Sequence, residues 1–226
     1  MSTIVYIGGD KGGVGKSMVA IALSDYVKHA LGAPVLLIEK DPVNPDAAKC
    51  LEHEIDGVLM ADTAAPEGLR DLLNAIEAHG ESRTVINAGA RDNRAMEKFG
   101  AYLVSGAAAL DATLAAGWVI NAERDSLLAL RRFLEIFPGK IWVIGNQFFD
   151  ESGEFSIYMG SSVRAEIEKR GGSLLVFPVL PHLLAAAIRN DRLSPSAQRK
   201  NGALFERISL EHWRAGAADV FRTMLG

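Results

Sequence analysis

The hydrophobic residues of the chain fall into short aliphatic runs separated by longer amphipathic stretches. Runs such as Val35–Ile38 and Ile141–Ile144 are apolar at successive positions. Because apolar and polar residues do not alternate in them, both faces of these strands are expected to be covered, as in a parallel sheet between helices. The pattern predicts strands at Ile4–Ile7, Val35–Glu39, Gly57–Ala61, Thr84–Asn87, Thr113–Ile120, Lys140–Gly145 and Ser173–Phe177.

Stretches of helical periodicity lie between these strands. They are Lys16–Leu31, Glu67–His79, Asn93–Leu103, Arg124–Ile136, Ser161–Lys169, Pro181–Asn190 and Gly202–Met224. Strands that alternate with helices through short connections predict right-handed βαβ units. The expected fold is α/β, a three-layer, doubly wound, mainly parallel sheet with helices on both faces, in a single domain over residues 1–226. Asp150–Glu154 and Leu193–Ser196 are expected to be surface loops.

Composition excludes several classes of function. The 226 residues include 24 basic and 28 acidic side chains and one cysteine, Cys50. A single cysteine cannot form an internal disulfide, a cysteine-rich zinc site or an iron–sulfur centre. The net charge of −4 argues against a globally basic nucleic-acid coat protein. The start of the chain lacks a signal-peptide pattern and no apolar run reaches 18 residues, so a cytoplasmic protein is expected.

The strongest chemical signal is the segment Gly8–Ser17, GGDKGGVGKS, which follows the first predicted strand and precedes a helix. Its glycines let the backbone approach phosphate oxygens closely, and the positive end of the following helix points at the same anion. Lys16 supplies a charge to the β- and γ-phosphates, and the Ser17 hydroxyl can ligate Mg²⁺. The segment therefore predicts a nucleotide site.

The stretch Lys11–Ser17 resembles the deviant Walker A motif of the ParA/MinD family of ATPases, because Lys11 precedes the glycines. The resemblance implies ATP or ADP with Mg²⁺ as cofactors and a catalytic role for Lys16. It also implies that Lys11 reaches the phosphates bound by the partner in a nucleotide-sandwich homodimer. The nucleotide-binding residues that it implies in this loop are Gly12, Gly13, Val14, Gly15, Lys16, Ser17 and Met18.

Acidic residues end the second predicted strand, where ligands of open α/β sheets bind. The family carries Asp-x-Asp-Pro here, and its second aspartate orients the attacking water. Asp41, before Pro42, matches that catalytic position, and Glu39 replaces the first aspartate. Asp41 could instead only cap a turn. The segment Asp41–Pro45 is similar to that of the ATPases of conjugal-transfer operons, the TraL type.

Two residues are candidates for the acidic residue that P-loop enzymes carry near the metal, at the end of a strand. Thr84–Asn87 is similar to that strand in the conjugal-transfer relatives, but Asn87 stands where the carboxylate is expected. An amide accepts a hydrogen bond from metal-bound water and brings no charge. Asp62 ends the other candidate strand. Either Asp62 serves the metal, or binding rests on Ser17 and the phosphates, which predicts slow hydrolysis.

The resemblance further implies a base site at the ends of the last two strands. Asn146 matches the asparagine whose amide pairs with adenine, and Pro178 lies where the family's chain wraps the base. An amide offers both a donor and an acceptor, which suits the adenine edge. Without the resemblance, Asn146 is interpreted as a turn residue.

The charge balance reverses near the end of the chain. Residues 189–226 hold seven basic and four acidic side chains, a net +3, which leaves −7 for residues 1–188. Basic residues near the C-terminal helices of ParA-like dimers contact DNA backbones without sequence preference, a salt-dependent contact, although a solvated helix face is the more ordinary interpretation. An apolar stripe follows at helical spacing, and its polar face lacks a lysine cluster, so core packing is expected and no stable membrane anchor. The stripe consists of Trp213, Ala217, Val220, Phe221 and Met224.

Together these features predict an ATPase that dimerises with ATP, opens after hydrolysis on water positioned by Asp41, and is read by a stimulating protein partner. Plasmid mobilisation, conjugal transfer or partition is the expected setting. One alternative is an ATP-binding scaffold with little hydrolysis, suggested by Asn87 and Glu39. A small-molecule ligase or kinase of the same superfamily is a further alternative, against which Lys11 and Asp41 count.

Overall fold

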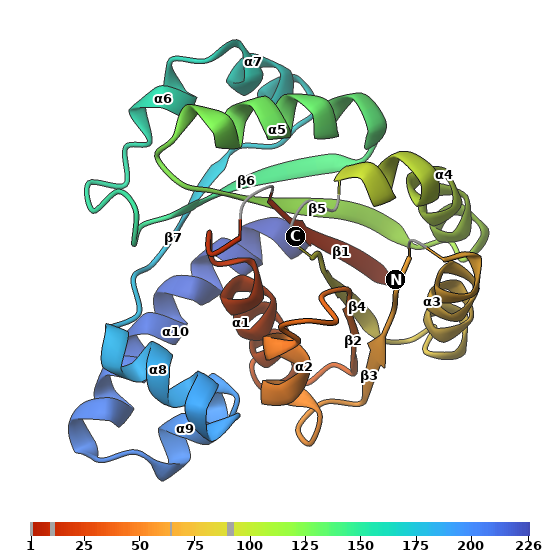
Figure 1. The fold of residues 1–226 in the computed structure, drawn as a ribbon. Coiled ribbons are helices and arrows are strands. Elements are labelled where there is room, and N and C mark those ends of the chain that lie inside the picture. The colour runs from red at the N-terminus through yellow and green to blue at the C-terminus, as the bar shows by residue number, and fades with distance from the viewer. Residues whose placement is uncertain (1, 10–11, 64, 90–92) are drawn as a thin grey trace.

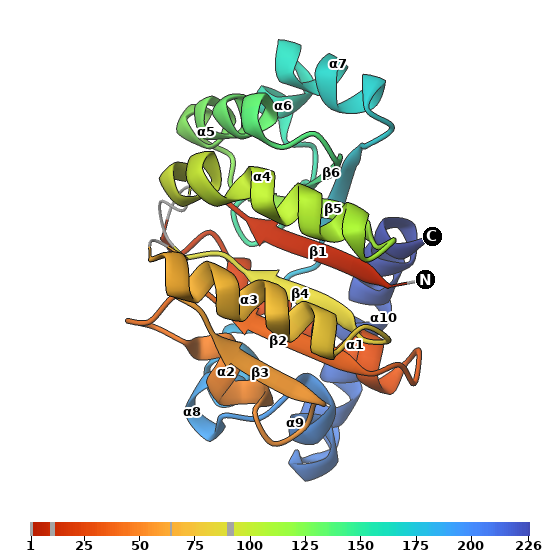
Figure 2. The ribbon, with the colours of Figure 1, turned by 90° about the vertical axis from the view of Figure 1, so that its right-hand side faces the viewer.

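The computed structural model describes residues 2–9, 12–63, 65–89 and 93–226, with the backbone alone at 93–95. Its centre is a seven-stranded sheet in which every neighbouring pair of strands is parallel (Figures 1 and 2). The strand order is β3-β2-β4-β1-β5-β6-β7. The strands are β1 (Thr3–Gly8), β2 (Val35–Glu39), β3 (Gly57–Met60), β4 (Arg83–Asn87), β5 (Thr113–Ile120), β6 (Lys140–Asn146) and β7 (Leu174–Phe177). The predicted α/β fold with a parallel sheet is confirmed.

Helices cover both faces of this sheet. On one side lie α1 (Lys16–His29), α2 (Asp46–Leu51), α8 (His182–Asp191), α9 (Pro195–Asn201) and α10 (Leu204–Leu225). On the other side lie α3 (Pro66–Ala78), α4 (Asn93–Ala109), α5 (Arg124–Ile136), α6 (Ser156–Met159) and α7 (Ser162–Lys169). Among the described residues, no helix is long and apolar enough to cross a membrane.

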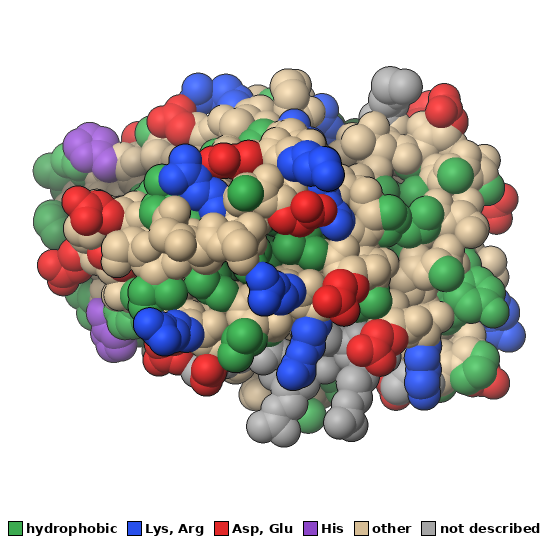
Figure 3. All heavy atoms as spheres, turned by 90° about the horizontal axis from the view of Figure 1, so that it is seen from above, with side chains coloured by type: hydrophobic (Ala, Val, Ile, Leu, Met, Phe, Trp, Pro, Cys, Tyr) green, Lys and Arg blue, Asp and Glu red, His purple; other side chains and the backbone are tan. Residues whose placement is uncertain are grey.

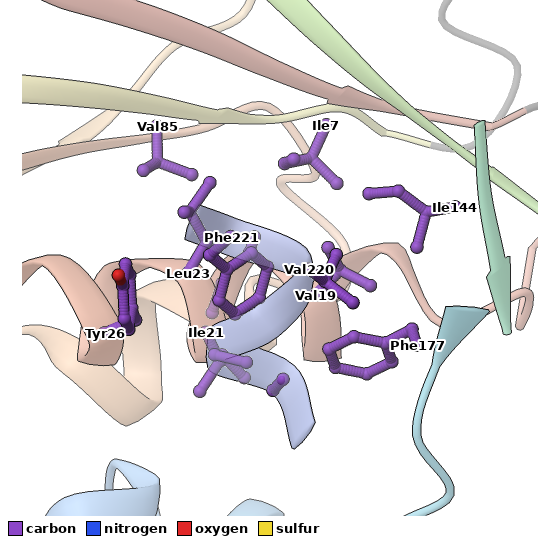
Figure 4. Packing of buried hydrophobic residues seen from close by; sticks show 14 of the residues in the cluster. Ile7, Val19, Ile21, Leu23, Tyr26, Val85, Ile144, Phe177, Val220 and Phe221 are labelled. Atoms are coloured by element: carbon purple, nitrogen blue, oxygen red, sulfur yellow. The ribbon is translucent and has the colours of Figure 1, made fainter. Parts of the chain in front are cut away.

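The pleat of the strands divides the core into two layers. On β1, Val5 and Ile7 point to the layer of α1 and α10, whereas Ile4 and Tyr6 point to the layer of α3, α4 and α5. Figure 4 shows the first layer, where Phe221 of α10 packs among side chains of α1 and the sheet. Successive side chains along a strand therefore face different helices, and the same alternation places the polar side chains at the strand ends on one face of the sheet or the other.

The apolar stripe of the last helix is part of the core, as expected. Its five residues are buried against the sheet and α1. Fully burying a side chain the size of Phe221 contributes roughly 2–3 kcal/mol relative to leaving it in water. The stripe is therefore covered by the protein itself and gives α10 its place in the fold.

Polar contacts tie the C-terminal helices to α1. Asp25 of α1 is buried, and its carboxylate accepts hydrogen bonds from the Ser196 N–H of α9 at 2.9 Å and from Arg214 Nε of α10 at 3.0 Å. This carboxylate thus joins three helices. Because α1 begins at the phosphate loop, the same contacts fix the helix on which that loop depends.

The structure corrects the expected loop at Leu193–Ser196. A helix begins inside it, because the Ser194 hydroxyl accepts a hydrogen bond from the Ala197 N–H and Pro195 takes the first helical position. The short helices α2 and α6 were not predicted either, since six and four residues are too few to show helical periodicity. Helix α4 extends beyond the expected end at Leu103 to Ala109, and Ala107 is buried in the core.

Candidate functional site

The glycine-rich loop lies at the carboxyl edge of the sheet, between β1 and α1. It forms one wall of a hollow of about 320 Å³. Asp41 and Asn44 of the loop after β2 lie on the hollow as well, together with Asp46 of α2. The described loop residues that line it are Gly12, Gly13, Gly15, Lys16, Ser17 and Met18. All of these were expected to bind nucleotide, and the structure gathers them around one concave surface.

The start of α1 is built to receive an anion. Gly15 takes the N-cap position with a φ of 104°, and no side chain among the described residues caps the helix. The first N–H groups of the helix are therefore directed into the loop, where the positive end of the helix dipole adds to their effect. Val14, expected as a loop contact, is buried, and its carbonyl accepts a hydrogen bond from the Asn146 side chain.

The order of the strands places the two candidates for the metal side at different distances from the phosphate loop. Asn87 ends β4 and pairs in register with Ile7 of β1, directly before the phosphate loop. Asp62 follows β3, the outermost strand, and β2 and β4 separate it from β1. The side chain of Asn87 contacts Ser17, with 3.3 Å between Nδ2 and Oγ. The geometry therefore favours Asn87 over Asp62 as the residue beside the metal position.

A carboxylate from the neighbouring strand β2 lies beside the Asn87 side chain. Glu39 pairs in register with Asn87, and both of its carboxylate oxygens lie 3.0 Å from Asn87 Nδ2. Both side chains are completely buried. Burial raises the pKa of Glu39 above its ordinary value, and hydrogen bonds from Asn87 and from the Asp41 N–H offset part of that effect.

Lys40, between the two acidic residues, lies on the opposite face of the sheet. Its ammonium group stands over the Phe99 ring at 3.9 Å from the centroid and over the Tyr6 ring at 5.8 Å. The pleat of β2 therefore directs Glu39 toward α1 and Lys40 toward α4.

Asp41 takes part in the turn that follows β2. Its Oδ1 accepts hydrogen bonds from the Val43 N–H at 3.1 Å and the Asn44 N–H at 2.9 Å. The capping interpretation is thus correct for this oxygen. The turn also orients the carboxylate at the rim of the hollow, so capping and a role toward water are compatible.

The two residues expected at the base site lie side by side at the edge of the sheet. Asn146 pairs in register with Phe177, and Pro178 follows directly. The Asn146 amide donates from Nδ2 to the Val14 carbonyl at 2.9 Å and accepts the Phe148 N–H at Oδ1. The Pro178 carbonyl accepts a hydrogen bond from Trp213 Nε1 at 3.0 Å. One hydrogen and one lone pair of the amide remain for a ligand, and contact of either residue with a base stays a prediction.

One residue of the hollow was not foreseen. Arg189 of α8 lines it, although the sequence placed this arginine only among the C-terminal basic residues. No local pattern could have shown this, because α8 is more than 150 residues from the phosphate loop and reaches it only through the fold.

Three of the C-terminal basic residues are paired with acidic side chains. Arg199 pairs with Glu211, Arg214 with the buried Asp25, and Arg222 with Asp219. Figure 3 shows a different face, on the side of α5 and α7, where basic and acidic side chains are interspersed. Contact of the C-terminal residues with DNA stays a prediction.

The residues beside Ser17 fit a divalent cation of the magnesium type. A hydroxyl, an amide oxygen and a carboxylate are oxygen groups that Mg²⁺ accepts, directly or through water. The Asn87 Oδ1 atom is buried and has no hydrogen-bond partner among the described residues. An orphaned acceptor at this position suits a hydrogen bond from metal-bound water. Lys11, the lysine expected to act across a dimer, lies outside the described residues.

Similarity to known proteins agrees with this geometry. Protein MobD of Acidithiobacillus ferrooxidans is 36% identical over 224 residues, which cover 99% of this chain and 98% of that protein. No family profile matches the sequence.

Solved structures show the same fold. MinD in the MinC:MinD complex of Aquifex aeolicus matches with a TM-score of 0.59 and 18% identity, covering 97% of this chain and 95% of that one. MinD of Pyrococcus horikoshii with Mg-ADP matches with a TM-score of 0.58 and 17% identity, covering 97% of this chain and 96% of that one. A variant of Cyanothece McdA in complex with ATP gives 0.56 and 16%, over 96% of each chain. The chain therefore belongs to the family of protein MobD, and it has the fold of MinD and McdA.

Proposed function

We propose that the protein is an ATP-binding, slowly hydrolysing ATPase that works as a nucleotide-dependent dimerisation switch. One observation carries the proposal: phosphate-loop residues and Asp41 line the same hollow at the carboxyl edge of the sheet. This arrangement brings a cradle for phosphates and a carboxylate able to orient water to the same cavity.

Each residue has a definite task in this proposal. The N–H groups of the loop and the Lys16 ammonium group hold the phosphates and offset their charge. Ser17 and Asn87 face the Mg²⁺ that accompanies ATP or ADP, whose own charge would stabilise the transferring phosphoryl group. Asp41, oriented by its turn, accepts a hydrogen bond from the attacking water. Lys11 adds a positive charge from the partner subunit, which makes dimerisation depend on the γ-phosphate.

The setting that we propose is plasmid mobilisation, conjugal transfer or partition. The support is the relationship to MobD along nearly the whole chain and the likeness of the Asp41–Pro45 segment to conjugal-transfer ATPases. A partner protein that reads the ATP-bound dimer, and stimulates hydrolysis, completes the switch. MinD appears with MinC in one similar structure, which is a precedent for such a partner.

Mass measurement in solution tests the switch. The wild-type protein is expected to be a dimer with ATP and a monomer with ADP or without nucleotide, because only the γ-phosphate needs a second lysine. Lys11→Ala should bind ATP and stay monomeric. Asp41→Ala should dimerise with ATP and remain dimeric, since hydrolysis is lost. Equal masses of the wild type in all three nucleotide states would contradict the proposal.

A second candidate is an ATP-binding scaffold without turnover, favoured by the amide of Asn87 at the metal side. The two candidates differ in phosphate release. Release that disappears in both Lys16→Ala and Asp41→Ala establishes the ATPase, whereas tight ATP binding without any release supports the scaffold.

A further inference from the structure

The metal side of the nucleotide site contains an amide and a carboxylate in an unusual arrangement. Asn87 ends β4, next to the phosphate-loop strand, and Glu39 ends β2, one strand further out. The Asn87 Nδ2 atom lies 3.0 Å from both Glu39 oxygens and 3.3 Å from Ser17 Oγ. One nitrogen atom therefore contacts both the Glu39 carboxylate and the hydroxyl expected to ligate the metal.

The chemistry of the groups fixes how this amide is turned. A carboxylate only accepts hydrogen bonds, so the donor end of Asn87 must face Glu39. Its acceptor end, Oδ1, is buried without a hydrogen-bond partner among the described residues. The residue thus holds the carboxylate with one end and offers a free acceptor with the other, as an outer-shell residue around a hydrated cation does.

Neutral donors hold the Glu39 carboxylate. It is completely buried, and it accepts hydrogen bonds from the Asn87 amide and from the Asp41 and Ala48 N–H groups. Lys40 is next in sequence, but its ammonium group stands over the Phe99 ring on the other face of the sheet. A buried charge is costly unless an opposite charge accompanies it, and a divalent cation at Ser17 would supply one.

We propose that Glu39, acting through Asn87, supplies the negative charge that holds Mg²⁺ at the nucleotide site. The acid has moved from β4 to the neighbouring strand β2, and the amide on β4 transmits its effect by polarisation and orientation. Glu39 is in this view a positioning residue for the cation that accompanies a nucleoside triphosphate. The inference rests on the proposed ATP binding.

The test measures how much Mg²⁺ tightens the binding of a slowly hydrolysed fluorescent ATP analogue. The readout is the ratio of the Kd in EDTA to the Kd with Mg²⁺, which does not depend on turnover. Glu39→Gln should lower this ratio by about 10- to 100-fold, the usual cost of losing an outer-shell partner. The Kd in EDTA should stay unchanged or improve, since a negative charge near the phosphates is removed.

A swapped pair provides the decisive rescue. In Glu39→Gln/Asn87→Asp the amide and the carboxylate exchange strands, so the pair keeps its charge and its hydrogen bond in reverse order. This variant should recover most of the Mg²⁺ ratio. Asp62→Asn is the matched control, because it removes a carboxylate from the end of the outermost strand and should leave the ratio unchanged.

The outcomes separate this inference from the proposed function. A wild-type protein that binds no ATP analogue under either condition contradicts the proposed function and, with it, the inference. A wild-type protein whose Mg²⁺ ratio survives in Glu39→Gln keeps the function and overturns the inference, as would loss of the ratio in Asp62→Asn. Thermal unfolding without nucleotide checks that each variant is folded. Should Glu39→Gln not fold, Glu39→Asp takes its place, because the shorter side chain keeps the charge and draws it away from Asn87: a lowered ratio supports the inference and an unchanged ratio overturns it.

Discussion

Replacing single glycines of the phosphate loop by alanine separates backbone strain from contact in the absence of nucleotide. An added Cβ meets nothing within 4 Å at Gly12 or Gly13, whereas at Gly15 it overlaps the Asn146 amide. The φ angle is positive at Gly13, 82°, and at Gly15, 104°, and is not positive at Gly12. The three positions therefore differ by one physical factor at a time.

The expected costs follow from these differences. Alanine in the left-handed region costs about 1–2 kcal/mol, and the stiffer unfolded chain returns about 0.4–1 kcal/mol. Gly12→Ala should thus be neutral or about 0.5 kcal/mol stabilising. Gly13→Ala should lower the free energy of unfolding by about 1 kcal/mol. Gly15→Ala should lower it by about 2 kcal/mol, because the Asn146–Val14 hydrogen bond is lost as well.

Urea unfolding without nucleotide measures the series. With a slope of about 3 kcal/mol/M, the midpoint should rise by roughly 0.2 M for Gly12→Ala and fall by roughly 0.3 M and 0.7 M for the other two. Equal midpoints for Gly12→Ala and Gly13→Ala would refute the assigned backbone conformation. A Gly15→Ala midpoint no lower than that of Gly13→Ala would refute the contact with Asn146.

Three further results are expected. Arg214→Ala should lower the free energy of unfolding, measured in urea, by about 3 kcal/mol, because the buried carboxylate of Asp25 loses the guanidinium group that pairs with it. The same substitution should cost less in an Asp25→Asn background, and equal costs in the two backgrounds would contradict this. Burial raises the pKa of the Cys50 thiol to about 11, so only about one thiol in a thousand is ionised at pH 8. A thiol reagent should therefore label the folded protein over hours and the denatured protein at once, and rapid labelling of the folded protein would refute the burial. Burial tends to raise the pKa of Asp56, but hydrogen bonds from Lys28 and a backbone N–H outweigh it and lower that pKa. Wild type should therefore be more stable than Asp56→Asn at pH 7, by at most about 1 kcal/mol for this partly exposed pair, and the difference should shrink as the pH falls through the lowered pKa; a difference that does not depend on pH would contradict this.

Much of the site could be derived from local signals. The loop Gly12–Ser17 needs only glycines, a lysine and a hydroxyl between a strand and a helix, and all of these are neighbours in sequence. The alternation of side chains along a strand is also a local property. Glu39 lies an even number of residues after Val35, and Asn87 after Val85, so both point to the face of α1, whereas Lys40 points to the other face. This alternation follows from the backbone geometry of any strand, so it can be predicted without knowing how the strands pair.

The order of the strands is not a local property. Strand β4 comes after β3 in the sequence but lies between β2 and β1, and this placement makes Asn87 the neighbour of Ser17 and moves Asp62 to the outer edge. The contact between Glu39 and Asn87, 48 residues apart, follows from the same order. So does the arrival of Arg189 at the phosphate hollow.

The sequence by itself determined the parallel α/β architecture and the residues of the phosphate loop, because these depend on patterns of a few residues. Only the tertiary structure decided which strand ends meet, because the pairing of distant strands is set by the packing of all layers together. For this protein, that pairing placed a neutral amide beside the Ser17 hydroxyl and a buried carboxylate next to that amide.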